Sequence, residues 1–326
     1  MPPGGIGDMI RQDFMWATLV HLTTNCWYEE GNDFSGKPSW IWAQPGSREV
    51  RLDRDLLLSY LDEMKAAGVN TVMLDVGDAM RFDSHPEIAA EGAYTKEEMR
   101  ALLTRMEEMG FEVIPKLNLS ATHDYWMGDY ARMLSTPIYY RFVQDIIDET
   151  IAFFQPRFLH IGMDEENYEL QKEYEYVVVR QKKLWWHDLY FYVDCVEKHG
   201  VRAMMWSDYA REKPEEFIEK CPRSVVQCVW YYFNKYGDNV EDRFKIRTRP
   251  LLLLDQAGFD QMPTGCVIFD KDALPLLAAY CKKRLTPSRL LGFMQTTWDP
   301  VLPDWMEELR EGNRRLSEAR KLFEEQ

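Results

Sequence analysis

Short apolar segments alternate with longer amphipathic segments along almost the whole chain. The apolar or β-branched segments predict eight strands, over residues 14–22, 70–76, 111–117, 157–161, 201–206, 225–230, 250–254 and 291–296. Between them, apolar residues recur at helical spacing, as in 54–67 and 95–109, and each of these two segments ends at a glycine. Strands that alternate with helices are typical of a parallel sheet with crossover helices, and eight is the number that closes a (β/α)8 TIM barrel.

Local signals place several boundaries. Thr95, followed three residues later by Glu98, forms a capping box that fixes the start of the second helix. Residues 303–326 carry apolar positions within a charged segment and predict a closing helix. No linker divides the chain, so we expect one α/β barrel domain over 13–326 after a flexible lead-in over 1–12. A doubly wound open sheet is the alternative, but no glycine-rich phosphate turn follows the first predicted strand.

Charge and composition exclude several classes of partner. The 326 residues carry a net charge of −15, which repels nucleic acid and anionic membrane surfaces. We find no uncharged stretch long enough to span a bilayer and no signal-like N-terminus, so we expect a cytoplasmic protein, or a secreted or periplasmic one if a signal peptide has been removed. The six cysteines show no paired short spacing, so we predict reduced thiols without a zinc knuckle.

Polar and aromatic residues gather where the predicted strands end, which is where barrel enzymes place their functional groups. Indole rings stack on the apolar faces of a sugar, and carboxylates accept hydrogen bonds from its hydroxyls. This combination predicts a carbohydrate site, although any one of the tryptophans could instead be a core residue. The candidate substrate-binding residues are Asp78, Asn118, His123, His160, Trp206, Asp208, Tyr209, Trp230, Asp255, Trp298 and Asp299.

The fourth predicted strand ends in three consecutive acids, Asp164, Glu165 and Glu166. A strand that delivers carboxylates at its C-terminal end is suited to general acid/base chemistry. Helix capping by acids at the start of a helix over 165–171 is the simpler alternative, but it explains one acid more readily than three. Gly162 allows a tight turn that would direct the following side chains into the barrel mouth.

These residues carry a resemblance to a known family. The segment 160–165, His-Ile-Gly-Met-Asp-Glu, resembles the His-x-Gly-Gly-Asp-Glu motif of family 20 glycoside hydrolases, the β-N-acetylhexosaminidases. Upstream, the segments 92–99 and 110–115 are similar to that family's Gly-x-Tyr-Thr-x-Glu-Glu-Ile and Gly-Ile-x-Val-Ile-Pro stretches, and the spacing to the acids also fits. The likeness covers roughly residues 14–300 and is strongest over 68–166.

The resemblance implies a glycosidase that cleaves a terminal β-linked, N-acetylated hexosamine. Glu165 would be the general acid/base, with a raised pKa, and Asp164 would orient the acetamido group, whose oxygen replaces an enzymic nucleophile. Glu166 would be a bystander. The likeness also implies that Trp206, Trp230 and Trp298 form the sugar subsite and that Leu254 and Asp255 end a Tyr-Leu-Asp element.

This sequence departs from the family where the sugar would bind. Leu253 stands at the position of a tyrosine that binds the acetamido oxygen, although Tyr209 or Tyr232 could supply a hydroxyl. The first strand offers His21 and Thr23 in place of an arginine, and Met163 replaces the second glycine of the motif. We therefore expect a divergent member with altered sugar or linkage preference.

Other functions remain open. A glycosidase acting on a sugar without an acetamido group would need a second carboxylate, for which Asp208, Asp255 and Asp299 are candidates. An inactive carbohydrate-binding barrel would need no acid, yet Glu165 is present. A metal-dependent hydrolase would need histidines converging from several strands, and the six histidines lie in unrelated contexts. We predict no cofactor and no metal, and the sequence leaves open whether the chain forms a homodimer.

Overall fold

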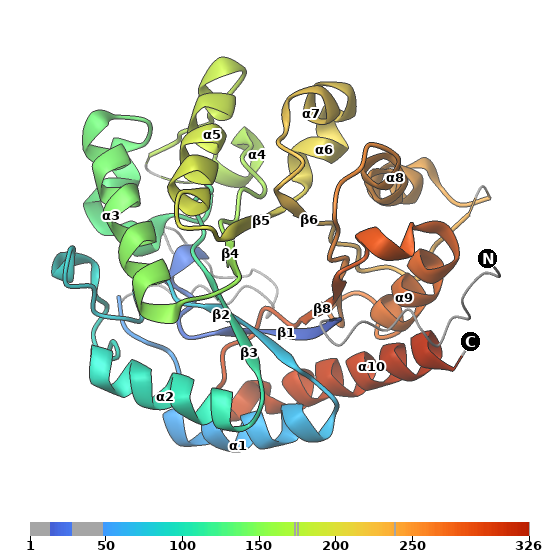
Figure 1. Ribbon diagram of the computed structural model, residues 1–326, viewed down its shortest axis with the longest axis horizontal. Coiled ribbons are helices and arrows are strands. Elements are labelled where there is room, and N and C mark those ends of the chain that lie inside the picture. Colours follow the sequence, from blue (N-terminus) through green and yellow to red (C-terminus); the bar gives the residue numbers. More distant parts are fainter. Residues whose placement is uncertain (1–13, 28–47, 173, 175, 238, 326) are drawn as a thin grey trace.

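The computed structural model describes residues 14–27, 48–172, 174, 176–237 and 239–325. Eight parallel strands form one sheet in the order β6-β5-β4-β3-β2-β1-β8-β7, with helices around its outside (Figure 1). The isolated bridges Gln227↔Gln261 and Trp230↔Thr264 join the β6 and β7 edges. The predicted (β/α)8 TIM barrel is thereby confirmed. The predicted lead-in over 1–12 lies outside the described residues.

The strands are short and lie close to the predicted segments, with one exception. They are β1 (Met15–His21), β2 (Thr71–Asp75), β3 (Glu112–Lys116), β4 (Phe158–His160), β5 (Arg202–Trp206), β6 (Val226–Cys228), β7 (Thr264–Cys266) and β8 (Gly292–Thr296). The exception is the seventh, because residues 250–254 belong to a helix and not to a strand.

The helices are α1 (Arg54–Ala66), α2 (Lys96–Glu108), α3 (Pro137–Phe154), α4 (Tyr168–Gln171), α5 (Lys183–Glu197), α6 (Asp208–Glu212), α7 (Pro214–Lys220), α8 (Asp242–Gln256), α9 (Ala273–Arg284) and α10 (Met306–Glu324). Short 3-10 helices are η2 (Asn25–Trp27), η3 (Pro86–Ile88), η4 (Tyr125–Met133), η5 (Pro287–Arg289) and η6 (Pro303–Trp305). The Thr95–Glu98 capping box is present at α2, and the closing helix α10 lies beside α9 and α1 (Figure 1). In the described part of the chain, no helix has the length and apolar character needed to cross a membrane.

The strands alternate between the barrel interior and the helix layer. In β1, Met15, Ala17 and Leu19 belong to the cluster that fills the barrel, whereas Trp16 and Val20 belong to the larger cluster under the helices. This period of two follows from the pleat of a strand. The interior cluster includes Trp206 at the C-terminal end of β5. The barrel below the candidate site is therefore a packed core and not an open channel.

The burial pattern of α8 shows why the prediction of a strand over residues 250–254 was wrong. Leu251 and Leu254 are buried and the two leucines between them are only half-buried, which is the i, i+3 spacing of a helix face. A short apolar run does not by itself distinguish a buried strand from a buried helix. Asp255 therefore lies near the end of a helix and not at a strand end, and Leu253 does not occupy the expected tyrosine position of a strand.

Candidate functional site

The loop after β4 has an unusual backbone. Gly162 has a φ of 74°, Met163 of 71° and Glu165 of 54°, all in the left-handed region. Only glycine fits at 162, because a Cβ there would lie 2.1 Å from the Oδ1 atom of Asn118. Met163 and Glu165 adopt the same region at a cost of about 1–2 kcal/mol each. The expected helix over 165–171 begins only at Tyr168, so neither Asp164 nor Glu165 caps it.

Hydrogen bonds from neighbouring segments hold this strained backbone in place. The Ser120 hydroxyl donates to the carbonyl of Asp164, and the Thr122 hydroxyl donates to the carbonyl of Glu165 over 2.8 Å. The Asn167 backbone N–H also donates to the Glu165 carbonyl over 2.8 Å. The chain that leaves β3 therefore fixes the direction in which both acids leave the loop.

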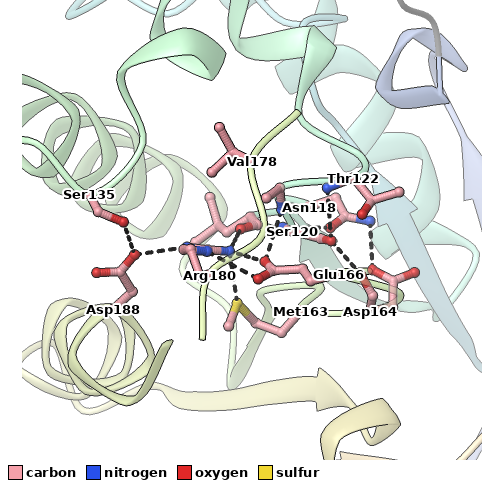
Figure 2. A network of polar contacts seen from close by, with 12 residues as sticks. Asn118, Ser120, Thr122, Ser135, Met163, Asp164, Glu166, Val178, Arg180 and Asp188 are labelled. Atoms are coloured by element: carbon pink, nitrogen blue, oxygen red, sulfur yellow. Dashed lines mark hydrogen bonds and ion pairs between the residues drawn. The ribbon is translucent and has the colours of Figure 1, made fainter. Parts of the chain in front are cut away.

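Glu166 anchors the acidic loop through a buried ion pair, and its predicted lack of a catalytic role stays a prediction. The guanidinium of Arg180 is fully buried and bonds both carboxylate oxygens of Glu166. It also donates to Asp188 Oδ2 over 3.1 Å and to the Leu119 carbonyl over 2.8 Å. Figure 2 shows Arg180 between Glu166 on the acidic loop and Asp188 of α5. The network ties the loop to the helix layer.

Asp164 and Glu165 share a histidine. The Nε2 atom of His123 lies 3.5 Å from Asp164 Oδ2 and 3.4 Å from Glu165 Oε2. The Asn118 side chain donates to Asp164 Oδ1 over 3.2 Å, as Figure 2 also shows. The Asp164 side chain is 11% exposed and that of Glu165 is 37% exposed, so Glu165 is the more accessible acid.

The three groups have perturbed pKa values. Burial raises the pKa of Asp164, and the charge of Glu165 adds to this effect while His123 opposes it. Burial also acts to raise the pKa of Glu165, but the hydrogen bond and charge of His123, together with the charges of Arg211 and Arg247, leave that pKa lowered. Burial acts to lower the pKa of His123, but the two acids leave it raised. The expected raised pKa of Glu165 was therefore wrong for the free protein.

A cavity of about 270 Å³ opens above these acids. The three predicted tryptophans lie in its wall, with 5.7 Å between the ring centroids of Trp206 and Trp298. A positive φ of 65° at Trp298 belongs to the turn that follows β8. The residues that line the cavity are Trp27, His123, Asp164, Glu165, Trp206, Trp230, Tyr232, Phe233, Arg247, Ile268, Phe269 and Trp298.

Sequence reasoning did not single out Trp27, Phe233, Arg247, Ile268 and Phe269. Trp27 follows the first strand closely, and an aromatic residue near a strand end was the same signal that identified the other tryptophans. Ile268 and Phe269 follow the true β7, so the misplaced seventh strand concealed them. Arg247 lies on α8 and gave no signal that sequence alone could interpret.

Several predicted residues lie outside this cavity. Asp78 is fully buried, accepts a hydrogen bond from Asn25 over 2.9 Å and has a pKa raised by burial to about 6. Tyr209 stacks on Trp185 and donates to Glu216. Asp299 lines a different cavity, and Asp255 accepts hydrogen bonds from Thr286. None of these four residues lines the cavity.

His160 and Asp208 do not line the cavity but contact residues that do or that lie beside it. The His160 ring lies 4.5 Å from that of Trp206, and its Nδ1 accepts the N–H of Gly162 over 3.1 Å. Asp208 lines a neighbouring cavity of about 470 Å³ that shares Glu165 with the first. Its carboxylate binds Arg211 over 2.8 Å and accepts the Trp230 indole N–H over 2.9 Å. Glu165 thus stands between two cavities.

One group of described residues has the composition of a metal site. Ligand atoms of His123, Asp164 and Glu165 all lie within 4.8 Å of one another. A histidine with two carboxylates is a donor set that suits zinc or a similar cation. The same three groups also satisfy one another as an ion-paired cluster, so the geometry alone does not require an ion.

The sequence and the fold both match known proteins. The family model for glycosyl hydrolase family 20, catalytic domain, matches residues 122–243. A lacto-N-biosidase from Bifidobacterium bifidum is 21% identical over 132 residues, which is 36% of this chain and 12% of that protein.

Solved structures with the same fold include two from this family. The β-N-acetylhexosaminidase from Streptomyces coelicolor has a TM-score of 0.62 and 14% identity, covering 93% of this chain and 64% of that one. The chitobiase from Flavobacterium johnsoniae has a TM-score of 0.58 and 17% identity, covering 86% and 49%. The chain thus spans about half the length of the chitobiase. The matched region holds His123, Asp164 and Glu165, so this part of the chain is similar to the catalytic domain of glycosyl hydrolase family 20.

Proposed function

We propose that this protein is a glycoside hydrolase that cleaves a terminal β-linked hexosamine bearing an N-acetyl group. The observation that carries the proposal is the pair of neighbouring carboxylates, Asp164 and Glu165, which share His123 at the floor of an aromatic cavity. Stacking of the sugar on Trp206, Trp230 or Trp298 would place its glycosidic oxygen near the acids.

In this proposal Glu165 donates the proton to the leaving oxygen. In the free protein His123 keeps the pKa of Glu165 lowered. An entering sugar covers the exposed 37% of the Glu165 side chain and strengthens burial, the effect that raises the pKa. Substrate binding therefore shifts the pKa of Glu165 upward, toward the carboxylic acid form. After the C1–O bond breaks, the carboxylate accepts a proton from the incoming water.

Asp164 and Tyr232 are assigned to the acetamido group. As the acetamido oxygen attacks C1, positive charge develops on the ring that forms, and the buried carboxylate of Asp164 stabilises it. Tyr232 lines the cavity, and burial raises its pKa well above its usual value, so it retains its proton. Tyr209 does not serve here, because its hydroxyl is bonded to Glu216.

The arrangement disfavours a mechanism with a second enzymic nucleophile. Asp255 and Asp299 lie outside the cavity. Asp208 is near Glu165, but burial raises its pKa to about 7 despite Arg211, so much of it is protonated at neutral pH. A protonated carboxyl is a poor nucleophile, so the substrate's own acetamido oxygen is the better candidate.

A hydrolysis screen tests the proposal. Chromogenic β-GlcNAc, β-GalNAc and β-glucoside are compared for the wild type, Glu165→Gln, Asp164→Asn and the control Glu169→Gln. Glu169 is four residues from Glu165 and its side chain is 76% exposed, so the control makes the same chemical change on the surface. We expect turnover of acetamido sugars only, with a loss of at least 100-fold for Glu165→Gln and Asp164→Asn.

Three results would contradict the proposal. Undiminished turnover in Glu165→Gln would remove the assigned acid. Turnover confined to the β-glucoside would leave a glycosidase but would exclude assistance by the acetamido group. No hydrolysis combined with measurable sugar binding would favour a carbohydrate-binding barrel.

A further inference from the structure

Arg247 brings a positive charge into the cavity from α8. Its side chain is half-buried, with Cζ 5.4 Å from the ring centroid of Trp230 and 5.9 Å from that of Phe233. Within the described parts of the chain, no carboxylate lies at ion-pair distance from it, whereas Arg243 and Arg249 of the same helix pair with Glu241 and Glu215. Arg247 is thus the α8 arginine that faces the cavity, and it has no acid partner there.

The acids around the cavity already have cationic partners. Asp164 and Glu165 share His123, and Asp208 binds Arg211 over 2.8 Å. The charge of Arg247 is therefore not consumed by a short contact with any of them. The positive charge of Arg247 at the cavity wall is opposite in sign to the chain's net charge of −15.

Trp230 holds the cation in place. Arg211 Cζ lies 4.7 Å and Arg247 Cζ 5.4 Å from the centroid of the Trp230 ring. The indole N–H is itself fixed by Asp208. Cation–π contacts with a ring that cannot rotate freely orient the guanidinium before a ligand arrives, which lowers the entropic cost of binding.

We propose that the substrate carries an anionic group, a sulfate ester or a carboxylate, that Arg247 binds. A guanidinium presents paired N–H donors that match the two oxygens of such an anion, and neutral sugar hydroxyls do not require a charged donor. This inference rests on the proposed glycosidase function and adds the class of substrate.

The test compares neutral and anionic glycosides. The substrates are chromogenic β-GlcNAc, its 6-O-sulfate and a β-GlcNAc with a carboxyphenyl leaving group, which separate an anion on the sugar from one on the aglycone. For the wild type, one anionic substrate is expected to exceed the neutral one in kcat/KM by about tenfold or more. Arg247→Gln should bring that ratio close to one, Arg247→Lys should keep part of it, and the control Arg249→Gln should leave it unchanged.

Other outcomes would overturn the inference. A ratio that is the same in the wild type and Arg247→Gln means that the anion is not bound there. A shift in the pH profile for β-GlcNAc without a change in the ratio means that Arg247 acts only on Glu165.

Equilibrium binding separates this inference from the proposed function. If the wild type hydrolyses nothing but binds GlcNAc 6-sulfate more tightly than GlcNAc, and Arg247→Gln removes that difference, the function fails and the anion site stands. If hydrolysis occurs but neither anionic substrate nor GlcNAc 6-sulfate is preferred, the anion site fails and the function stands.

Discussion

Replacing Glu166 by glutamine tests whether the acidic loop depends on its buried ion pair. The substitution keeps the size of the side chain and removes its charge. Arg180, which is fully buried, then loses one of its two carboxylate partners and keeps Asp188 at 3.1 Å. Glutamine can still accept the N–H of Ala121, which Glu166 Oε1 accepts over 2.9 Å in the native protein.

The expected cost follows from the burial of both groups. Removing one partner of a buried ion pair typically costs about 3–5 kcal/mol, and the remaining Asp188 places this case near about 3 kcal/mol. A chain of this length has an unfolding entropy of about 0.7 kcal/mol per degree, so the melting temperature should fall by about 4 °C. Because Glu165 adjoins Glu166, kcat should also fall by about tenfold or more.

The assay is thermal unfolding of the wild type, Glu166→Gln and Glu169→Gln, with kcat measured on the best substrate of the screen. Glu169 is three residues away and binds Lys172 over 3.1 Å on the surface. Its substitution should change stability by no more than about 0.5 kcal/mol. Equal melting temperatures for the two variants would refute the anchoring role of Glu166.

Three further predictions concern the rest of the site. Asp255→Asn should leave kcat/KM unchanged and lower the melting temperature by no more than a few degrees, because the Asp255 carboxylate accepts hydrogen bonds from Thr286 and does not line the cavity; a large loss of activity would restore it to the site. Burial raises the pKa of Asp208 to about 7, so the native state binds its proton more tightly than the unfolded chain. The free energy of unfolding should therefore fall as pH rises from about 4 to about 7, relative to Asp208→Asn, and urea unfolding that shows parallel pH curves for both proteins would contradict this. Dialysis against a chelator should leave hydrolysis unchanged; activity lost on chelation and restored by zinc would assign a metal to His123, Asp164 and Glu165.

Seven of the eight strands and the acidic loop could be predicted from the sequence, since each pairs an apolar run with a clear end. The seventh strand could not, because Thr264–Cys266 reads Thr-Gly-Cys and carries no bulky apolar side chain, unlike the equally short β4 (Phe-Leu-His) and β6 (Val-Gln-Cys). The leucines at 251–254 offered a stronger strand signal than the true strand. That error also moved Asp255 into the predicted site and left Ile268 and Phe269 out.

The role of each carboxylate depends on residues that are distant from it in the sequence. Asp164, Glu165 and Glu166 are adjacent, and three neighbouring negative charges would repel one another without compensation. His123, upstream of the loop, neutralises part of the charge of the first two, and Arg180, downstream, takes the third. The sequence identifies the acids but not this division, because pairing is set by the barrel and not by sequence spacing.

The division also determines which acid can change its protonation. Glu166 is locked to a buried guanidinium and Asp164 is held by Asn118 and His123, so neither can approach a leaving group without breaking a buried contact. Glu165 differs from both, because its side chain is 37% exposed and lines both cavities. In the proposed mechanism the transferred proton is therefore assigned to Glu165, and the buried contacts of Asp164 and Glu166 hold the loop that carries it.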